Sequence, residues 1–257
     1  MRSDAVEIDR FYRSHRGEAA RTMAQRRLSA LWPDARGLDV LGYGFATPWL
    51  EPYRESARRT VAFMPSCQGA IAWPDRREDK SAVCMGEETR LPFAEAMFDR
   101  VIVAHALEET ENLQRLLREL WRVMSPEGRL VIIAAHRSGA WARVDATPFG
   151  HGRPFSRGQL TRALQGALFE PTAWARALYA PPWNWLCGPR TANGFEAVGE
   201  KLWPGFGGLI LVEAVKHVGA VRPRASLATV KPLEAASPAG LSAEPASQNA
   251  TRKDDPS

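Results

Sequence analysis

Cysteine is scarce in this sequence, and its placement argues against a disulfide framework or a zinc knuckle. The three cysteines, Cys67, Cys84 and Cys187, are widely spaced and include no Cys-x-x-Cys pair. A reduced, cytoplasmic setting fits this usage best. The five histidines also lack the i, i+4 spacing that is typical of metal ligands, so we expect no metal site.

Long apolar runs and dense basic runs are missing too. No uninterrupted apolar run is long enough to cross a bilayer, and residues 1–7 lack the apolar core of a signal peptide. We therefore expect neither membrane insertion nor export. The formal net charge is +5, but the arginines are spread along the chain, whereas a nucleic-acid surface needs a clustered basic stripe. A nucleic-acid partner is therefore not expected.

The composition is that of an ordinary globular protein with one main domain. The chain has 257 residues, of which 45% are hydrophobic and 25% charged. Apolar residues at three-to-four spacing over 6–31 predict one or two amphipathic helices, which form an N-terminal helical extension over 1–35. The arginines between them form either a solvated face or a partner surface. Residues 219–257 are rich in Ala, Pro, Ser and charge, which predicts a disordered tail.

Short apolar runs alternate with helical patterns between these two ends. Strands are predicted at 38–41, 60–64, 82–84, 101–104, 130–135 and 208–216. Leucines at i, i+3, i+4 and i+7 predict a helix from Thr110 to Met124, capped by Thr110 and ended by a turn at 125–128. Ser156 and Gln159 form a capping box that begins another helix. This alternation predicts a doubly wound α/β fold with a mostly parallel sheet.

The segment Gly37 to Ala46 contains the first predicted strand, which runs straight into a glycine-rich turn. Gly42 and Gly44 would let the backbone pass close to a ligand at a strand-to-helix turn. The alternative is a tight turn without a ligand. Thr47 and Pro48 are expected to begin the next helix, which Pro52 would kink or delay.

Four segments together resemble one family. They are the Gly42-x-Gly44 turn, Gly86-Glu87, the Leu-Pro-Phe to Phe-Asp-Arg-Val segment at 91–101, and the Glu-x-x-Arg-Val-x-x-Pro-x-Gly segment at 119–128. Over about residues 36–170 they resemble the class I S-adenosylmethionine-dependent methyltransferases of the small-molecule type. The resemblance implies a Rossmann-like, mostly parallel sheet of seven strands, in a methyltransferase-like domain over 36–218. The last two segments are expected to be architectural.

The resemblance also implies a binding site for S-adenosylmethionine. It places cofactor contacts at Gly42, Tyr43, Gly44, Glu87, Glu88 and His105. The alternative for Glu87 is a solvent-exposed acid in a loop. The alternative for His105 is a partly buried histidine whose hydrogen bonds are made within the protein.

The first motif departs from the family pattern. Ala46 replaces the third glycine, and Val40 replaces an acidic residue. Asp39 lies one residue before that acidic position, and a one-residue bulge in the strand would bring its carboxylate there. Met64 lies where the family places a ribose-binding acid.

The resulting hypothesis is methyl transfer to a small or apolar acceptor, and the alternative is an inactive methyltransferase-like scaffold or regulatory protein with a protein partner. His151 and Arg153 follow the fifth predicted strand and would contact the acceptor, unless they belong to a plain glycine-rich loop. An aromatic and proline-rich segment at 179–189 predicts a lid, an apolar wall or burial at the sheet edge. The sequence assigns no catalytic residue.

Overall fold

The computed structural model describes residues 3–74, 81–183 and 205–217, together with Gly194, Glu196, Val198, Gly199, Leu202 and Trp203. The predicted tail at 219–257 and most of the aromatic segment after Trp183 lie outside these residues. The described elements in chain order are α1 (Ala5–Tyr12), α2 (His15–Leu31), β1 (Asp39–Gly44), α3 (Thr47–Leu50), η1 (Glu51–Tyr53), β2 (Arg59–Pro65), β3 (Val83–Gly86), β4 (Phe98–Ala104), α4 (Leu113–Val123), β5 (Met124–Ala135), η2 (Trp141–Arg143), η3 (Pro148–Gly150), α5 (Arg157–Gly166), β6 (Phe169–Ala177) and β7 (Leu209–Lys216).

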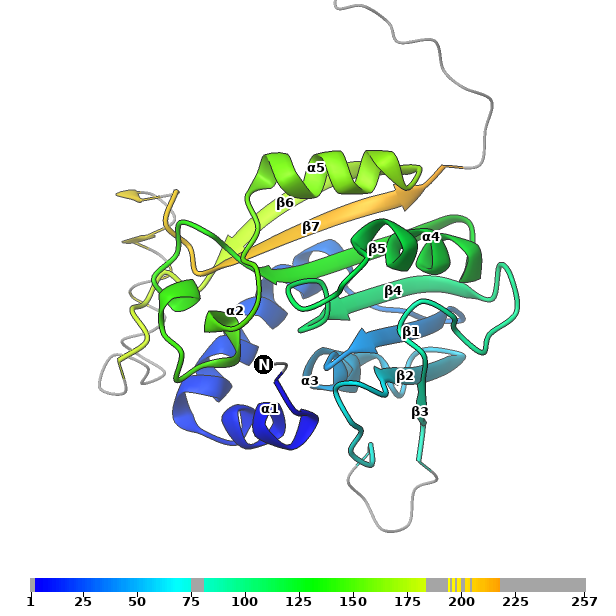
Figure 1. Cartoon of the computed structure of the whole chain (residues 1–257), viewed down its shortest axis with the longest axis horizontal. Coiled ribbons are helices and arrows are strands. Elements are labelled where there is room, and N and C mark those ends of the chain that lie inside the picture. Colours follow the sequence, from blue (N-terminus) through cyan, green and yellow to red (C-terminus); the bar gives the residue numbers. More distant parts are fainter. Residues whose placement is uncertain are drawn as a thin grey trace, which may run out of the picture. The chain divides into compact units, whose positions relative to one another are not determined.

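Seven strands form one mixed sheet in the order β3-β2-β1-β4-β5-β7-β6 (Figure 1). The first five strands in this order are parallel to one another, while β7 runs antiparallel to both β5 and β6. The predicted doubly wound, mostly parallel sheet is therefore confirmed. The residue pattern alone missed β6, an edge strand that contains Pro171 and has mixed burial.

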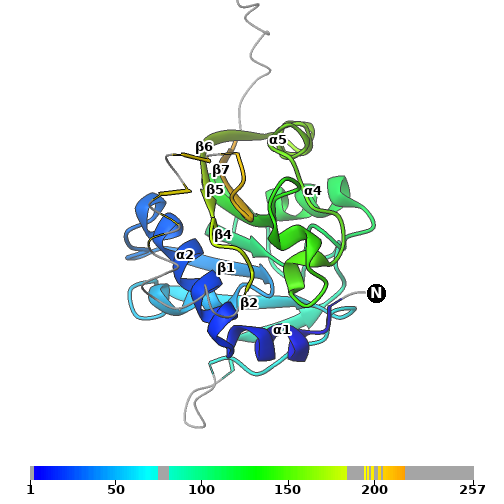
Figure 2. The same cartoon turned by 90° about the vertical axis from the view of Figure 1, so that its left-hand side faces the viewer.

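Helices cover both faces of the sheet, and each face has its own apolar cluster. Helices α1, α2 and α3 pack on one face, and α4 and α5 pack on the other (Figure 2). Successive β1 residues serve different faces, because Val40 joins the first cluster and Leu41 the second. Strand β1 is thus buried on both sides, as expected for a central parallel strand.

The boundaries around α4 correct two sequence expectations. Asn112 caps the helix, not Thr110, and its side chain accepts a hydrogen bond from the Arg115 amide at 3.0 Å. No separate turn follows the helix, because β5 begins directly at Met124. The Pro-Glu-Gly segment is absorbed as an irregular start of β5, with Glu127 at φ 60° and a register shift against β4.

The two segments that carry most of the family resemblance are architectural, as expected. Arg122 donates hydrogen bonds to the Leu91 and Phe93 carbonyls at 3.1 and 3.0 Å, and it pairs with Glu119 at 2.8 Å. Glu119 in turn accepts from the Leu91 amide. Arg122 therefore fastens the loop before β4 to helix α4.

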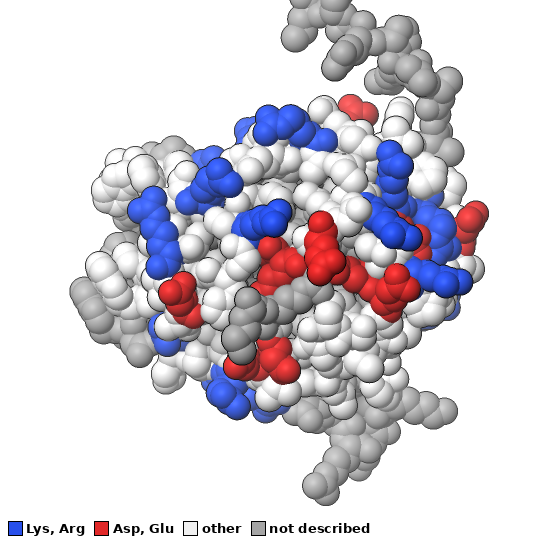
Figure 3. Space-filling view, viewed as in Figure 1, with Lys and Arg blue, Asp and Glu red and all other residues white. Residues whose placement is uncertain are grey.

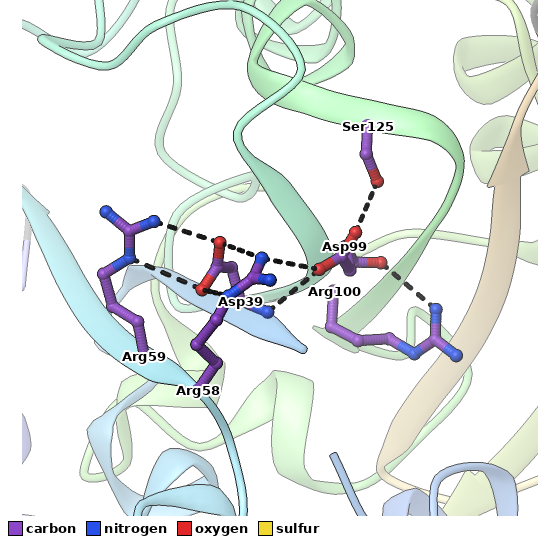
Figure 4. A network of polar contacts seen from close by, with 6 residues as sticks. All are labelled: Asp39, Arg58, Arg59, Asp99, Arg100 and Ser125. Atoms are coloured by element: carbon purple, nitrogen blue, oxygen red, sulfur yellow. Dashed lines mark hydrogen bonds and ion pairs between the residues drawn. The ribbon is translucent and has the colours of Figure 1, made fainter. Parts of the chain in front are cut away.

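A polar network closes the amino edge of the sheet (Figure 4). Asp39 accepts hydrogen bonds from Arg58 and Arg59 at 2.6 and 3.0 Å, and Asp99 accepts from the Asp39 amide and the Ser125 hydroxyl. The bonds from Arg58 lower the pKa of Asp39 to about 2. Strand β1 pairs in regular register from Asp39 onward, without the suggested bulge. Asp39 is a structural residue at the edge opposite the carboxyl ends of the strands.

Candidate cofactor site at the carboxyl edge of the sheet

The strand order reverses between β1 and β4, which are adjacent at the centre of the sheet. In open α/β sheets, ligands bind in the crevice outside the carboxyl ends of the strands at such a point. Gly42, Tyr43 and Gly44 belong to β1 itself and not to the expected turn. The next helix, α3, has only four residues, and Thr47 does not cap it.

Internal packing accounts for both glycines. A Cβ atom on Gly42 would collide with the Leu50 side chain. Gly44 has φ 75°, and a Cβ atom there would collide with the Ala104 carbonyl and lie 2.7 Å from the Ala106 Cβ. Gly44 is therefore required whether or not a ligand is bound, whereas a side chain at position 42 would force the Leu50 side chain to shift.

A small cavity lies outside the carboxyl ends of β2, β3 and β4. Its volume is about 10 Å³, and its lining residues are Pro65, Cys67, Gln68, Glu88, His105, Ala106 and Glu109. Glu88 faces this cavity, and its carbonyl accepts a hydrogen bond from the Tyr43 hydroxyl at 2.8 Å. Glu87 is exposed and does not line the cavity. The structure therefore brings Tyr43, Glu88 and His105 together and leaves Glu87 outside.

The N-terminal segment Ser3–Tyr12 lies across this edge (Figure 1). The Ser3 amide and hydroxyl both donate to the Glu109 carboxylate at 3.0 Å. The Ala5 amide donates to the Gln68 carbonyl at 2.8 Å. The Gln68 side-chain amide donates to the His105 carbonyl at 2.7 Å. The segment and Gln68 together fill the crevice in this conformation, a feature that no sequence pattern indicated.

His105 is buried among aromatic rings at the end of β4. Its Nε2 lies 2.6 Å from the Tyr12 hydroxyl, and its ring centre lies 4.8 Å from that of Phe149. Burial, with a smaller contribution from the charge of His151, lowers the pKa of His105 to about 3. A neutral, buried imidazole with a hydrogen-bond partner fits a structural role for His105 better than the role of a general base.

The two candidate acceptor residues, His151 and Arg153, face different surroundings. His151 Nδ1 lies 2.7 Å from the Ser3 hydroxyl, so this ring contacts the N-terminal segment. The Arg153 amide donates to the Glu108 carbonyl, and its side chain lines a separate, larger pocket. The structure does not bring these two side chains together in one site.

Glu108 is a buried acid that no sequence motif indicated. Its Oε1 accepts a hydrogen bond from the Ala135 amide at 2.8 Å, which joins the β4–α4 loop to the end of β5. Burial raises the pKa of Glu108 to about 7, against the lowering effect of this bond. Only its position beside the end of β4 in the sequence could have indicated it.

The acceptor atoms at the cavity suit the polar groups of S-adenosylmethionine, whereas the present volume does not suit its size. Gln68 Oε1 is buried and has no hydrogen-bond partner among the described residues. With the carboxylates of Glu88 and Glu109, it could accept from amino, ammonium or hydroxyl groups. A ligand pocket usually measures about 300–1,000 Å³, so binding requires the crevice to open.

Among the described side chains, no group of three or more His, Cys, Asp and Glu is arranged to hold a metal ion. No helix in the described part of the chain is both long and apolar enough to cross a membrane.

Comparison with known proteins also points to a methyltransferase. Residues 38–132 match the family model described as a methyltransferase domain. Malonyl-[acyl-carrier protein] O-methyltransferase of Pectobacterium atrosepticum is 29% identical over 136 residues, which is 51% of this chain and 53% of that protein. Demethylmenaquinone methyltransferase of Mycolicibacterium paratuberculosis is 37% identical over 109 residues, which is 42% of this chain and 45% of that protein. The chain thus spans about half the length of the curated relatives it matches.

Solved structures share the fold over a larger part of the chain. A methyltransferase from Thermotoga maritima, described as a possible histamine N-methyltransferase, has a TM-score of 0.58 at 18% identity and covers 82% of this chain and 95% of its own. The [4+2]-cyclase SpnF has a TM-score of 0.54 at 22% identity and covers 76% of this chain and 80% of its own.

The fold and the position of the crevice define a Rossmann-like methyltransferase architecture. Together with the family model, they confirm the resemblance drawn from the sequence. Residues 38–132 thus match a methyltransferase domain, and the sheet has the fold of solved S-adenosylmethionine-dependent methyltransferases.

Proposed function

We propose that this protein transfers a methyl group from S-adenosylmethionine to a small-molecule acceptor at the carboxyl edge of β1 and β4. The observation that carries the proposal is the methyltransferase domain over 38–132, whose β1–β4 reversal lies beside Glu88, Gln68 and Glu109. The cofactor supplies an activated methyl group, so the protein has mainly to position the reactants and exclude water. The cysteine usage supports a cytoplasmic location.

Cofactor binding in this proposal requires the segment Ser3–Tyr12 to move away from the crevice. The cavity of about 10 Å³ holds no more than about one water molecule. If only a fraction of the molecules is open, the observed affinity falls in proportion to that fraction. Weakening the contacts of Ser3 with Glu109 and His151 should therefore strengthen cofactor binding.

Calorimetric titration with S-adenosylmethionine and S-adenosylhomocysteine tests the proposal. Ser3→Ala should bind the cofactor more tightly than the wild type, while Ser138→Ala, an exposed serine outside the crevice, should bind as the wild type does. Glu88→Gln should weaken binding, with Glu87→Gln as the matched control from the exposed neighbouring position. Absence of binding to the wild type and to Ser3→Ala at millimolar ligand would favour the inactive scaffold instead.

A further inference from the structure

A second, larger pocket lies on the other side of the β4–α4 loop. Its volume is about 460 Å³, which is within the range of small-molecule sites. The β4–α4 loop, the segment after β5 and the first turns of α5 contribute to its wall. The lining residues are Leu107, Thr110, Glu111, Leu113, Arg137, Gly152, Arg153, Pro154, Phe155, Gln159 and Arg162.

The charged groups of this pocket are predominantly basic. Arg137, Arg153 and Arg162 line it, and Glu111 is its acidic member. None of the three guanidinium groups forms a hydrogen bond or ion pair with another described residue. They are therefore available to bind an anion from several directions, which arginine does through its planar set of N–H donors.

The wider surface does not explain this gathering of arginines. On the face shown in Figure 3, Asp and Glu side chains gather near the centre, and Lys and Arg side chains are scattered around them. A continuous basic surface, such as an extended nucleic-acid footprint would need, is not visible on the described part of this face. A bounded pocket indicates a small ligand more specifically than a polymer.

A buried hydroxyl in the same wall provides a second observation. Thr110 is 9% exposed, and its Oγ1 has no hydrogen-bond partner among the described residues. A buried polar atom usually has a partner, so an unpaired hydroxyl at a pocket wall indicates a ligand or an ordered water. Leu107, Leu113 and Phe155 supply apolar surface beside it.

The walls of the pocket are held in place by backbone and side-chain bonds. The Arg153 amide donates to the Glu108 carbonyl at 2.8 Å, and the Arg137 amide donates to the Phe155 carbonyl at 3.0 Å. Gln114 on α4 donates to the Ala163 carbonyl on α5 at 3.2 Å. The basic side chains therefore extend from a braced backbone, which lowers the ordering cost of binding.

We propose that this pocket binds a small molecule with a carboxylate or phosphate group and a short apolar body. The guanidinium groups hold the anionic group, Thr110 supplies a further hydrogen bond, and the apolar wall contacts the rest of the ligand. This site goes beyond the proposed methyl transfer and does not depend on it, because its ligand can be tested without S-adenosylmethionine.

Calorimetric titration with inorganic phosphate and with succinate, at constant ionic strength and without S-adenosylmethionine, tests the site. We expect binding of at least one anion, and the preferred anion indicates a phosphate ester or a carboxylic acid as the natural ligand. Arg137→Gln and Arg162→Gln should each weaken binding at least about tenfold, which corresponds to about 1.4 kcal/mol, because each removes charged hydrogen bonds to the anion.

Arg118→Gln is the matched control, because Arg118 is an exposed arginine of α4 outside the pocket wall. It should bind the anions as the wild type does, and thermal unfolding should show that all three variants are folded. Failure of both anions to bind at millimolar concentration would overturn the proposal. Equal weakening by Arg118→Gln would overturn it too, because it would indicate general attraction to a cationic protein.

Discussion

Replacing the buried Glu108 with glutamine should remove a pH-dependent loss of stability. Burial raises the pKa of Glu108 from 4.5 to about 7 in the folded protein. Between these two values the folded state keeps the proton while the unfolded chain has lost it. Stability therefore falls as pH rises through this range, because the unfolded state binds fewer protons. At 1.36 kcal/mol per pKa unit, the loss is about 3 kcal/mol.

Glu108→Gln keeps an oxygen that can accept the bond from the Ala135 amide, and it carries no ionisable group. The difference in the free energy of unfolding, wild type minus variant, should thus decrease by about 3 kcal/mol between about pH 4.5 and 7.5. Taking the difference cancels the opposite contribution of His105, whose lowered pKa makes stability rise with pH below its ordinary value.

Urea denaturation at a series of pH values measures this difference. Glu170→Gln, an exposed glutamate on β6, is the matched control and should keep the wild-type pH profile. Parallel stability profiles for the wild type and Glu108→Gln across this range would show instead that Glu108 is ionised or solvated in the folded protein.

Three further substitutions test the packing around the carboxyl edge and the loop before β4. Gly44→Ala should lower the free energy of unfolding in urea by more than about 2 kcal/mol, because φ is 75° and the new Cβ meets the Ala104 carbonyl. An unchanged free energy of unfolding would show that the ends of β1 and β4 can separate. Arg122→Ala should lower the free energy of unfolding by about 2 kcal/mol in the same assay, with the exposed Arg118→Ala as the control. Equal effects of the two substitutions would show that the bonds from Arg122 to the loop before β4 do not stabilise the fold. Tyr12→Phe should lower the melting temperature, because Nε2 of the buried His105 loses its hydrogen-bond partner, and an unchanged melting temperature would tell against this contact.

Much of the fold could be predicted because it follows from local patterns. The spacing of Leu113, Leu116, Leu117 and Leu120 specified the inner face of α4, and the capping box at Ser156 placed the start of α5. Strand β6 could not be found in this way. Its side chains have mixed burial, and its position is set by pairing with β7 along one edge of the sheet.

The candidate cofactor site was less predictable than the fold, because its geometry depends on contacts between distant segments. Gly42 and Gly44 suggested a ligand, yet Leu50 and Ala104 account for the absence of side chains there. The bond of Tyr12 to His105 joins residues 93 positions apart, so no local motif could indicate it. The assignments of Gly42, Tyr43, Gly44, Glu87, Glu88 and His105 to the cofactor stay predictions.

Hydrogen exchange with and without S-adenosylmethionine shows whether the cofactor binds at the β1–β4 edge as the segment Ser3–Tyr12 moves away. The amide of Ala5 is bonded to the Gln68 carbonyl in the closed crevice. With saturating cofactor, exchange should become faster over residues 3–12 and slower over residues 42–46 and 86–88. Unchanged exchange in all three segments would contradict it.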